Sequence, residues 1–296
     1  MGNQEQQASL KGHSSSVNCL KIGYGHIFSG SSDQTIRLWN IQTKKSQGVL
    51  YGHKSFITCL KIDNGMLYSG SSDNTIRIWD IETQQQLSVL KGHTYSIECL
   101  KLINGLLFSG SNDRTIGCWD IKREKEIYWL QHDNWVTSMK IVNGKLFSGS
   151  VCQNTKVKVW DIKRRLVTHL PTENDWGVTD LKKIGKNIIT SSGDGPIKIW
   201  DANTEQCLLT LNGHTERVSH LQIAYGKIIS ASEDKTIRIW DPLKSQSMVI
   251  LRENTEKTTC FKVAHGGIFT GHATGTIYEW DFRDSILQDE SPSLLL

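Results

Sequence analysis

Hydrophobic and polar positions alternate in short stretches of this chain, with the period of two that is typical of β-strands. The stretch 97–101, IECLK, shows this pattern, and it is followed by strand-favouring runs at 106–111, at 115–119 and at a segment that ends at Leu130. Asn104-Gly105 separates the first two runs and is a strong hairpin signal, because both positions tolerate positive φ. No stretch has the helical period of 3.6, so we expect four short antiparallel strands in this part of the chain.

The four-strand unit recurs along the whole chain. The stretches SGSSDQTIRLWN (29–40) and SGSSDNTIRIWD (69–80) differ at only three positions. A Trp ends this pattern at intervals of 40 or 41 residues, and an Asp follows it in all but the first copy. The seven tryptophans are Trp39, Trp79, Trp119, Trp160, Trp200, Trp240 and Trp280. A fixed period of this length indicates a solenoid, a propeller or an array of repeats.

The repeat predicts an all-β, seven-bladed β-propeller with four antiparallel strands per blade. One sheet of short strands buries too little apolar surface to be stable alone, whereas sheets packed around an axis cover one another's faces. The segment after Asp281 matches the fourth-strand pattern poorly, while NQEQQASLKGH near the N-terminus matches ETQQQLSVLKGH, which supplies a fourth strand elsewhere. We therefore expect residues 3–11 to complete the last blade, residues 1–281 to form the propeller, and residues 282–296 to form a C-terminal tail.

Composition narrows the class of partner. Of the 296 residues, 38% are hydrophobic and 22% are charged, with a formal net charge of only +4. The one dense basic cluster, 163–165, falls where a turn is expected, so we expect no nucleic-acid binding. No run approaches the ~18 apolar residues of a membrane helix, and the N-terminus lacks the features of a secretory signal. We expect neither a membrane association nor secretion.

The seven cysteines show no CxxC spacing. Cys19, Cys59, Cys99 and Cys260 occupy the same position in four different repeats, which predicts a recurring core position and not a set of disulfides. Free Cys behaves as a small buried hydrophobe and is typical of a reducing compartment. A cytoplasmic location is therefore expected, and the nucleus is also compatible with this composition.

The motifs within the repeats carry a specific resemblance. Gly-His pairs at Gly12-His13, Gly52-His53, Gly92-His93 and Gly213-His214 are each followed 26 or 27 residues later by Trp-Asp or Trp-Asn. Over residues 10–281 the chain resembles the WD-repeat family, and its repeats are most similar to those of propellers attached to F-box ubiquitin-ligase subunits. The resemblance implies a rigid platform for protein partners.

The resemblance also implies a role for four recurring polar positions. In this family, Asp, His, Ser and Trp link the loop, turn and strands of a blade by hydrogen bonds, and four copies within one chain argue against a catalytic triad. We expect the first serine of each SGS to take part. The expected tetrads are His13, Ser29, Asp33 and Trp39; His53, Ser69, Asp73 and Trp79; His93, Ser109, Asp113 and Trp119; and His214, Ser230, Asp234 and Trp240.

Three repeats depart from this pattern. In the fourth repeat, His132 lacks its preceding Gly and Asn154 stands at the Asp position. The fifth repeat has lost the His, and in the last one Asn254 and Thr274 replace His and Asp. These blades are expected either to be less stable or to use their loops for recognition.

Candidate binding residues precede the first strand of each blade, where the family resemblance places a peptide-binding face. Four aromatic residues and two cations stand there, and two further cations follow the turn Asp. Trp, Tyr and Arg dominate binding hot spots, although these rings could also pack on neighbouring loops. The predicted partner-binding residues are Phe56, Tyr95, Trp135, Trp176, Arg217, Lys257, Arg114 and Lys235. Cations beside aromatics favour a partner with acidic or phosphorylated side chains.

Three functions fit these features. The first is a non-enzymatic scaffold or adaptor, a monomeric propeller within a complex, which binds a peptide or protein on one face and could serve as a ubiquitin-ligase substrate receptor. The second is a structural subunit of a larger complex, and the third is a propeller enzyme. An enzyme would need unique groups in the central channel, where Asp180 and His220 replace the recurring Cys. No metal-binding spacing is present, and no cofactor is expected.

Overall fold

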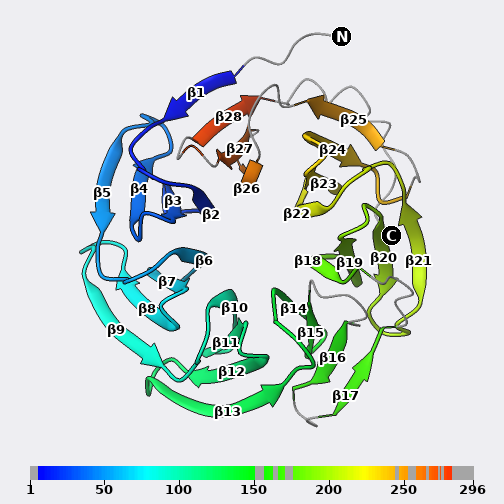
Figure 1. Cartoon of the computed structure of the whole chain (residues 1–296), viewed down its shortest axis with the longest axis horizontal. Coiled ribbons are helices and arrows are strands. Elements are labelled where there is room, and N and C mark those ends of the chain that lie inside the picture. The colour runs from blue at the N-terminus through cyan, green and yellow to red at the C-terminus, as the bar shows by residue number, and fades with distance from the viewer. Residues whose placement is uncertain are drawn as a thin grey trace.

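The computed structural model describes residues 6–150, 157–162, 166–170, 176–243, 247–252, 258–264, 267–272, 274 and 277–281. Within these residues the secondary structure consists of strands β1 to β28, with no helix. The strands form seven four-stranded antiparallel sheets that stand around a central axis like the blades of a propeller (Figure 1). The basic cluster 163–165 and the predicted tail 282–296 lie outside the described residues.

Blades 1 to 7 follow the chain, and the first strand of each blade lies nearest the axis (Figure 1). Blades 1 to 4 comprise β2 (Val17–Gly23), β3 (His26–Ser31), β4 (Ile36–Asn40) and β5 (Ser46–Leu50); β6 (Ile57–Asp63), β7 (Met66–Ser71), β8 (Thr75–Asp80) and β9 (Gln86–Lys91); β10 (Ile97–Ile103), β11 (Leu106–Ser111), β12 (Thr115–Asp120) and β13 (Lys125–Gln131); and β14 (Ser138–Val142), β15 (Lys145–Gly149), β16 (Lys158–Asp161) and β17 (Val167–His169). Blades 5 to 7 comprise β18 (Val178–Ile184), β19 (Asn187–Ser192), β20 (Ile197–Asp201) and β21 (Cys207–Leu211); β22 (Val218–Ala224), β23 (Lys227–Ser232), β24 (Thr236–Trp240) and β25 (Ser247–Arg252); and β26 (Thr258–Ala264), β27 (Gly267–His272), β28 (Ile277–Asp281) and β1 (Gln6–Leu10).

The N-terminal strand joins the last blade to the first. β1 pairs antiparallel with β28, and Leu10 lies opposite Ile277. In blade 2 the equivalent pair is Leu90 opposite Ile76, so Leu10 occupies the position of an ordinary fourth-strand leucine. Because the chain continues from β1 directly into blade 1, this pairing closes the ring and leaves no seam with an unpaired edge.

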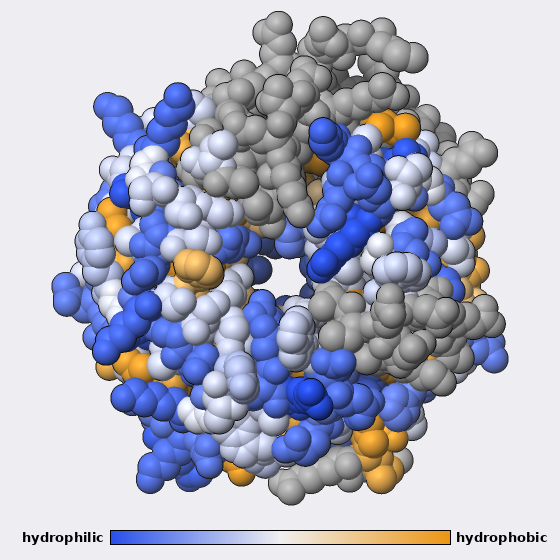
Figure 2. Space-filling model, in the orientation of Figure 1, coloured by the Kyte–Doolittle hydropathy of each residue, from blue (hydrophilic) through white to orange (hydrophobic). Residues whose placement is uncertain are grey.

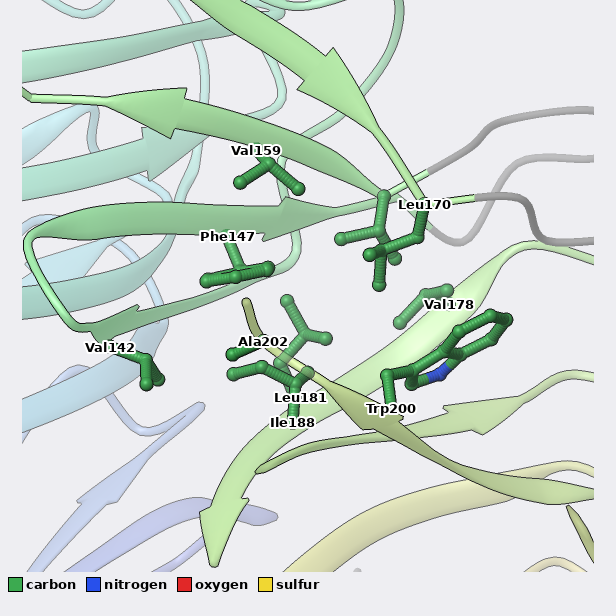
Figure 3. Packing of buried hydrophobic residues seen from close by; sticks show 10 residues of the cluster. Val142, Phe147, Val159, Leu170, Val178, Leu181, Ile188, Trp200 and Ala202 are labelled. Atoms are coloured by element: carbon green, nitrogen blue, oxygen red, sulfur yellow. The ribbon is translucent and has the colours of Figure 1, made fainter. Parts of the chain in front are cut away.

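Hydrophobic packing between neighbouring blades forms the core. Each of seven buried clusters contains side chains from two adjacent blades. At the junction of blades 4 and 5, Phe147 and Val159 face Leu181, Ile188 and Trp200 (Figure 3). Since each sheet contributes to two such clusters, both of its faces are covered by neighbours, as the short strands require.

Side chains on the first strands also bind the next blade directly. Asn18 Nδ2 donates to the Ile57 carbonyl at 3.0 Å, Thr137 Oγ1 donates to the Val178 carbonyl at 3.4 Å, and the Cys260 thiol lies 3.5 Å from the Val17 carbonyl. Because these acceptors begin the first strand of the following blade, the bonds fix the blades' relative positions.

The turns agree with the residues that form them. Asn104 and Gly105 have φ values of 49° and 77°, which confirms the predicted hairpin turn, since only residues that tolerate the left-handed region fit there. Where the structure describes them, the turns between first and second strands lie on one face of the disc, here named the lower face. The described turns between second and third strands, and the described residues that lead into the first strands, lie on the opposite, upper face.

Candidate functional site

The predicted aromatic residues on the upper face are exposed. Phe56 is 51% exposed, Tyr95 64%, Trp135 47% and Trp176 53%. About half or more of each side chain is thus open to solvent, so none of these rings is buried beneath a neighbouring loop. Arg217, Arg114 and Lys235 are exposed as well, and Lys257 lies outside the described residues.

Hydrogen bonds hold the backbone of these loops in place. The Phe56 carbonyl accepts from Ser72 N at 2.9 Å, and the Arg217 carbonyl accepts from Glu233 N, also at 2.9 Å. Each bond ties the residue before the first strand to the turn between the second and third strands of the same blade. The exposed side chains are thus carried by an ordered backbone, and binding would cost little conformational entropy.

Three of the predicted residues line a central channel. The channel encloses about 770 Å³, and its lining includes Phe56, Trp135 and Arg217, with Glu98 and Glu233 near them. In the view of Figure 2 the channel opens at the centre of the disc, while hydrophobic residues gather mainly near the outer edge. The mouth therefore combines two aromatic rings with charges of both signs.

The other described candidates lie on the same face but away from this opening. Tyr95, Trp176, Arg114 and Lys235 are exposed and are not part of the channel lining. Tyr95 and Trp176 stand two residues before their strands, whereas Phe56 and Arg217 stand directly before theirs. Trp135 holds the same place as Phe56, because it directly precedes Val136, which approaches Gly110 as Ile57 approaches Gly30. Because side chains alternate in direction along an extended backbone, this offset of one residue turns the rings away from the axis.

Asp180 and His220 line the channel deeper in. Asp180 Oδ2 accepts from Lys182 Nζ at 2.5 Å and from Leu221 N, in the next blade, at 2.9 Å. Burial raises the pKa of Asp180, but the charge and hydrogen bond of Lys182 and the Leu221 N–H outweigh it and hold that pKa below its usual value. A carboxylate with a lowered pKa and occupied oxygens is a poor general base, so its geometry favours a structural link between blades 5 and 6.

The recurring cysteines serve the junctions between blades. Cys99 and Cys260 are buried and Cys19 and Cys59 partly buried, all as free thiols. The Cys99 thiol lies 3.7 Å from the Val136 carbonyl of the next blade. Burial raises the pKa of Cys59 to about 12, so this thiol stays protonated and unreactive. The prediction of a recurring core position is confirmed for Cys99 and Cys260, and their donor role is an addition.

The four predicted tetrads form with nearly the same geometry. In blade 2, His53 Nδ1 lies 2.8 Å from Asp73 Oδ2, His53 Nε2 lies 2.7 Å from Ser69 Oγ, and Trp79 Nε1 donates to Ser69 Oγ at 2.9 Å. Equivalent bonds occur in blades 1, 3 and 6, which confirms that the first serine of each SGS takes part. The second serine instead accepts a hydrogen bond from the turn: Asp73 N donates to Ser71 Oγ at 3.0 Å.

The Trp at one end of a tetrad and the Asp at the other fix which atoms carry the protons. The indole N–H of Trp can only donate and an ionised Asp can only accept, so Ser donates to His Nε2 and His Nδ1 donates to Asp. This pattern requires a neutral histidine. Burial lowers the pKa of His13 and of His214, although the Asp partner of each raises it. Burial raises the pKa of Asp113, but hydrogen bonds from His93 and Thr115 outweigh burial and hold it at about 2.

A fifth residue completes each tetrad, and our reading of the sequence missed it. Thr75 Oγ1 donates to Asp73 Oδ1 at 2.6 Å, and Thr75 N donates to the same oxygen at 3.0 Å. The signal was present as a Thr two residues after each tetrad Asp. These threonines are Thr35, Thr75, Thr115 and Thr236.

The irregular blades keep only part of this chain. Trp160 Nε1 still donates to Ser148 Oγ at 2.8 Å, but the buried His132 Nε2 has no hydrogen-bond partner among the described residues. Burial and the charge of Lys158 lower the pKa of His132 to about 4. In blade 5, Trp200 Nε1 donates to Thr190 Oγ1 at 2.9 Å. Asn154 and Asn254 lie outside the described residues, and Thr274 is exposed.

The described residues contain neither a membrane-spanning helix nor a cluster of metal-ligating side chains. In the part of the chain that the structure describes, no helix is long and apolar enough to cross a membrane. No group of three or more His, Cys, Asp or Glu side chains within the same part is placed to hold a metal ion.

Comparison with known proteins identifies the repeat. The sequence profile of the WD40 family, described as WD domain, G-beta repeat, matches residues 4–40, 44–80, 84–120 and 205–241, which together are half of the chain. The chain belongs to this family. WD40 propellers typically act as protein-interaction scaffolds and are generally non-enzymatic.

Two known proteins are similar to this chain in sequence or in fold. The WD repeat-containing protein pop1 of Schizosaccharomyces pombe (strain 972 / ATCC 24843) is 25% identical over 77 residues, which are 26% of this chain and 10% of pop1. This chain thus matches only a small part of that relative. The crystal structure of the computationally designed Ika8 protein (crystal packing No.1 in P63) has a TM-score of 0.76 and 24% identity, and the match covers 94% of this chain and 100% of that chain. This likeness shows the fold alone.

Proposed function

We propose that this chain is a non-enzymatic scaffold or adaptor that binds a peptide or protein partner on its upper face. The observation that carries this proposal is the shared channel lining by Phe56, Trp135 and Arg217, all of which are exposed in the loops that lead into their first strands. Rigid aromatic and Arg side chains are the residues that dominate binding hot spots. Exposed rings of this size also lower solubility unless a partner covers them.

The charges of the upper face favour an acidic or phosphorylated partner. Arg217, Arg114 and Lys235 are exposed cations on the same face as the aromatic rings. Arg binds phosphate and carboxylate groups through paired N–H donors, while the aromatic rings would bind apolar side chains on either side of the charged one. Glu98 and Glu233, which line the channel, would disfavour acidic groups placed close to them and so add selectivity.

Within this role, a substrate receptor of a ubiquitin ligase or of a similar complex is our preferred assignment. It is supported by the resemblance of the repeats to F-box-associated propellers and by the exposed, rigid upper face. Each blade is covered by neighbours within one chain, which supports a monomeric propeller as the unit that enters such a complex. The free thiols support a reducing compartment, the cytoplasm or the nucleus.

Quantitative affinity purification tests the proposal. The triple variant Phe56→Ala/Trp135→Ala/Arg217→Ala should lose the partners that the wild type captures, because the binding side chains are removed while the tetrads and cores remain. Tyr24→Ala/Tyr225→Ala is the matched control, since both tyrosines are exposed in lower-face turns, at 56% and 59%. Equal capture by the wild type and the triple variant would contradict an upper-face site.

A second candidate function, a structural subunit of a larger complex, is favoured by the outer strands. Leu87, Ile127 and Leu208 are 53%, 48% and 55% exposed and occupy equivalent positions on β9, β13 and β21. A row of apolar side chains on the outer edge would suit burial against other subunits. Loss of capture in Leu87→Ser/Ile127→Ser/Leu208→Ser, with capture retained in the upper-face triple variant, would favour this second function.

A further inference from the structure

One residue in each first strand occupies the same position relative to the axis. In every blade this residue lies opposite the third residue of the second strand. For example, Lys21 lies opposite Phe28 and Lys101 lies opposite Phe108. Six of the seven residues at this position are lysines, and the seventh is Gln222. The set, here named the lysine ring, is Lys21, Lys61, Lys101, Lys140, Lys182 and Lys262. This register places the six lysines at one level around the axis.

The lysine ring faces the channel. Lys21, Lys101, Lys182 and Lys262 are part of the channel lining. All six side chains are partly buried, so their charges are partly removed from bulk water, and the four in the lining are reachable from the channel. The channel is continuous from this level to the mouth, because its lining includes both the ring and Phe56.

The protein supplies little counter-charge to the ring. Among the described residues, only Lys182 has a carboxylate partner, Asp180 at 2.5 Å. Lys262 Nζ donates to the neutral Gln222 Oε1 at 2.9 Å, and Lys101 Nζ donates to the backbone carbonyl of Leu100 at 3.2 Å. The remaining positive charge is thus left without neutralisation in a partly desolvated space, which is costly for the folded protein.

Because the charged form of a partly buried lysine is costly, the pKa values of four ring lysines are lowered. Burial, together with the charges of neighbouring lysines, lowers the pKa of Lys262 to about 7 and that of Lys140 to about 8. The same two causes lower the pKa of Lys21 and Lys101. A bound anion would reverse the effect of the neighbouring charges and favour the protonated form.

We propose that the lysine ring binds a small, soluble molecule that carries several phosphate groups. The channel volume of about 770 Å³ falls within the roughly 300–1,000 Å³ of typical small-molecule sites. A compact polyphosphate brings many negative charges to the single level at which the lysines stand. An extended acidic peptide spaces its residues about 3.3 Å apart along its length and would place only a few charges at that level. The ring and the upper-face partner site share one channel but use different residues.

Isothermal titration calorimetry with inositol hexakisphosphate and with tripolyphosphate, at about 0.15 M salt to suppress surface attraction, tests the proposal. We expect saturable binding of one molecule per chain and, at pH 8, proton uptake detected as a dependence of the heat on the buffer. Lys21→Gln/Lys101→Gln/Lys262→Gln should weaken binding by at least about tenfold, since three charge-assisted contacts to the anion are lost. Lys11→Gln/Lys54→Gln/Lys91→Gln removes the same charge from exposed positions and should leave binding unchanged.

Several outcomes would overturn the inference. They are an absence of saturable binding, equal weakening in the control variant, or tighter binding of an aspartate-rich peptide than of either phosphate probe. Binding to vesicles containing phosphatidylinositol bisphosphate in preference to the soluble probes would assign the site to a lipid headgroup instead. The ring variant should melt at or above the wild-type temperature, because like charges are removed. Phe56→Ala/Trp135→Ala should keep phosphate binding, so failure of the partner site and failure of the ring are distinguishable.

Discussion

Trp129 on β13 lies directly opposite Gly117 on β12 and fills space that a basic side chain occupies in neighbouring blades. Its ring centroid is 5.4 Å from that of Trp119, with the two planes at 81°. A Cβ atom on Gly117 would come within 2.8 Å of the Trp129 ring. In blade 2 the corresponding pair is Arg77 opposite Val89. Blade 3 thus carries the large side chain of this pair on its fourth strand, whereas blade 2 carries it on its third strand.

This exchange predicts strong coupling between the two positions. Gly117→Arg alone should destabilise blade 3, because the new side chain meets Trp129, and Trp129→Val alone should cost about 1–3 kcal/mol through lost packing. The double variant restores the combination found in blade 2 and should be more stable than Gly117→Arg by more than about 1 kcal/mol. Urea denaturation of the four proteins measures the coupling. Strict additivity of the two single effects would contradict this packing account.

The tetrad histidines should differ in their contribution to stability. His53→Leu leaves Asp73 and Ser69 without their partner and should lower the free energy of unfolding by about 2–3 kcal/mol. His132→Leu is the matched control, because His132 is equally buried, at 6% exposed for both residues, and its Nε2 has no partner among the described residues. Its cost should stay below about 1 kcal/mol. Equal destabilisation in the two variants, measured by denaturant melts, would show that packing and not hydrogen bonding makes these histidines important.

The closing strand should be as firmly packed as an internal one. Leu10 and Leu90 are 1% and 3% exposed and occupy equivalent positions in β1 and β9. Leu10→Ala and Leu90→Ala should therefore destabilise the protein by similar amounts, about 2–4 kcal/mol each. Ser9→Ala, at an exposed neighbouring position, serves as the control with little effect. A cost for Leu10→Ala below half that of Leu90→Ala would mean that the ring opens readily at this strand.

Because of the lysine ring, the free energy of unfolding should be larger at alkaline pH than at neutral pH. Folded Lys140 and Lys262 have pKa values of about 8 and about 7, below the unfolded value near 10.5. Between these limits the unfolded chain binds more protons, so the stability rises as the pH rises from 7 toward 10. The melting temperature of the wild type should increase by roughly 2–4 °C over this range. In Lys140→Gln/Lys262→Gln the increase should be smaller, whereas Lys54→Gln/Lys91→Gln should behave as the wild type; a flat wild-type profile would contradict the account.

Local features of the fold were readable from the sequence because each depends on residues close together in the chain. The Asn104-Gly105 turn requires positive φ at two adjacent positions, and period-two patterns locate the strands. Strand β12 runs to Asp120, one residue beyond the expected end, and β13 to Gln131. The tetrad serines were also predictable, since the first SGS position is Ser or Thr in every repeat.

Features that depend on the direction of a side chain within the assembled ring were not readable. Phe56 and Tyr95 look equivalent in the sequence, yet only Phe56 lines the channel, because one additional residue separates Tyr95 from its strand. The Cys-Leu-Lys pattern was visible in three repeats. Its meaning emerges only when neighbouring first strands stand side by side: the Cys59 and Cys99 thiols contact carbonyls of the next blade, and Lys21 and Lys101 line the channel.

The most direct test of the central claim is to locate the partner by photo-crosslinking. A photoreactive phenylalanine analogue is introduced in cells at position 56 or 135 on the upper face, at 24 or 225 on the lower face, and at 127 on the outer edge. We predict that positions 56 and 135 yield a covalent adduct with a partner protein and that positions 24 and 225 yield none. Adducts formed only at the lower face or at the outer edge would contradict an upper-face binding site.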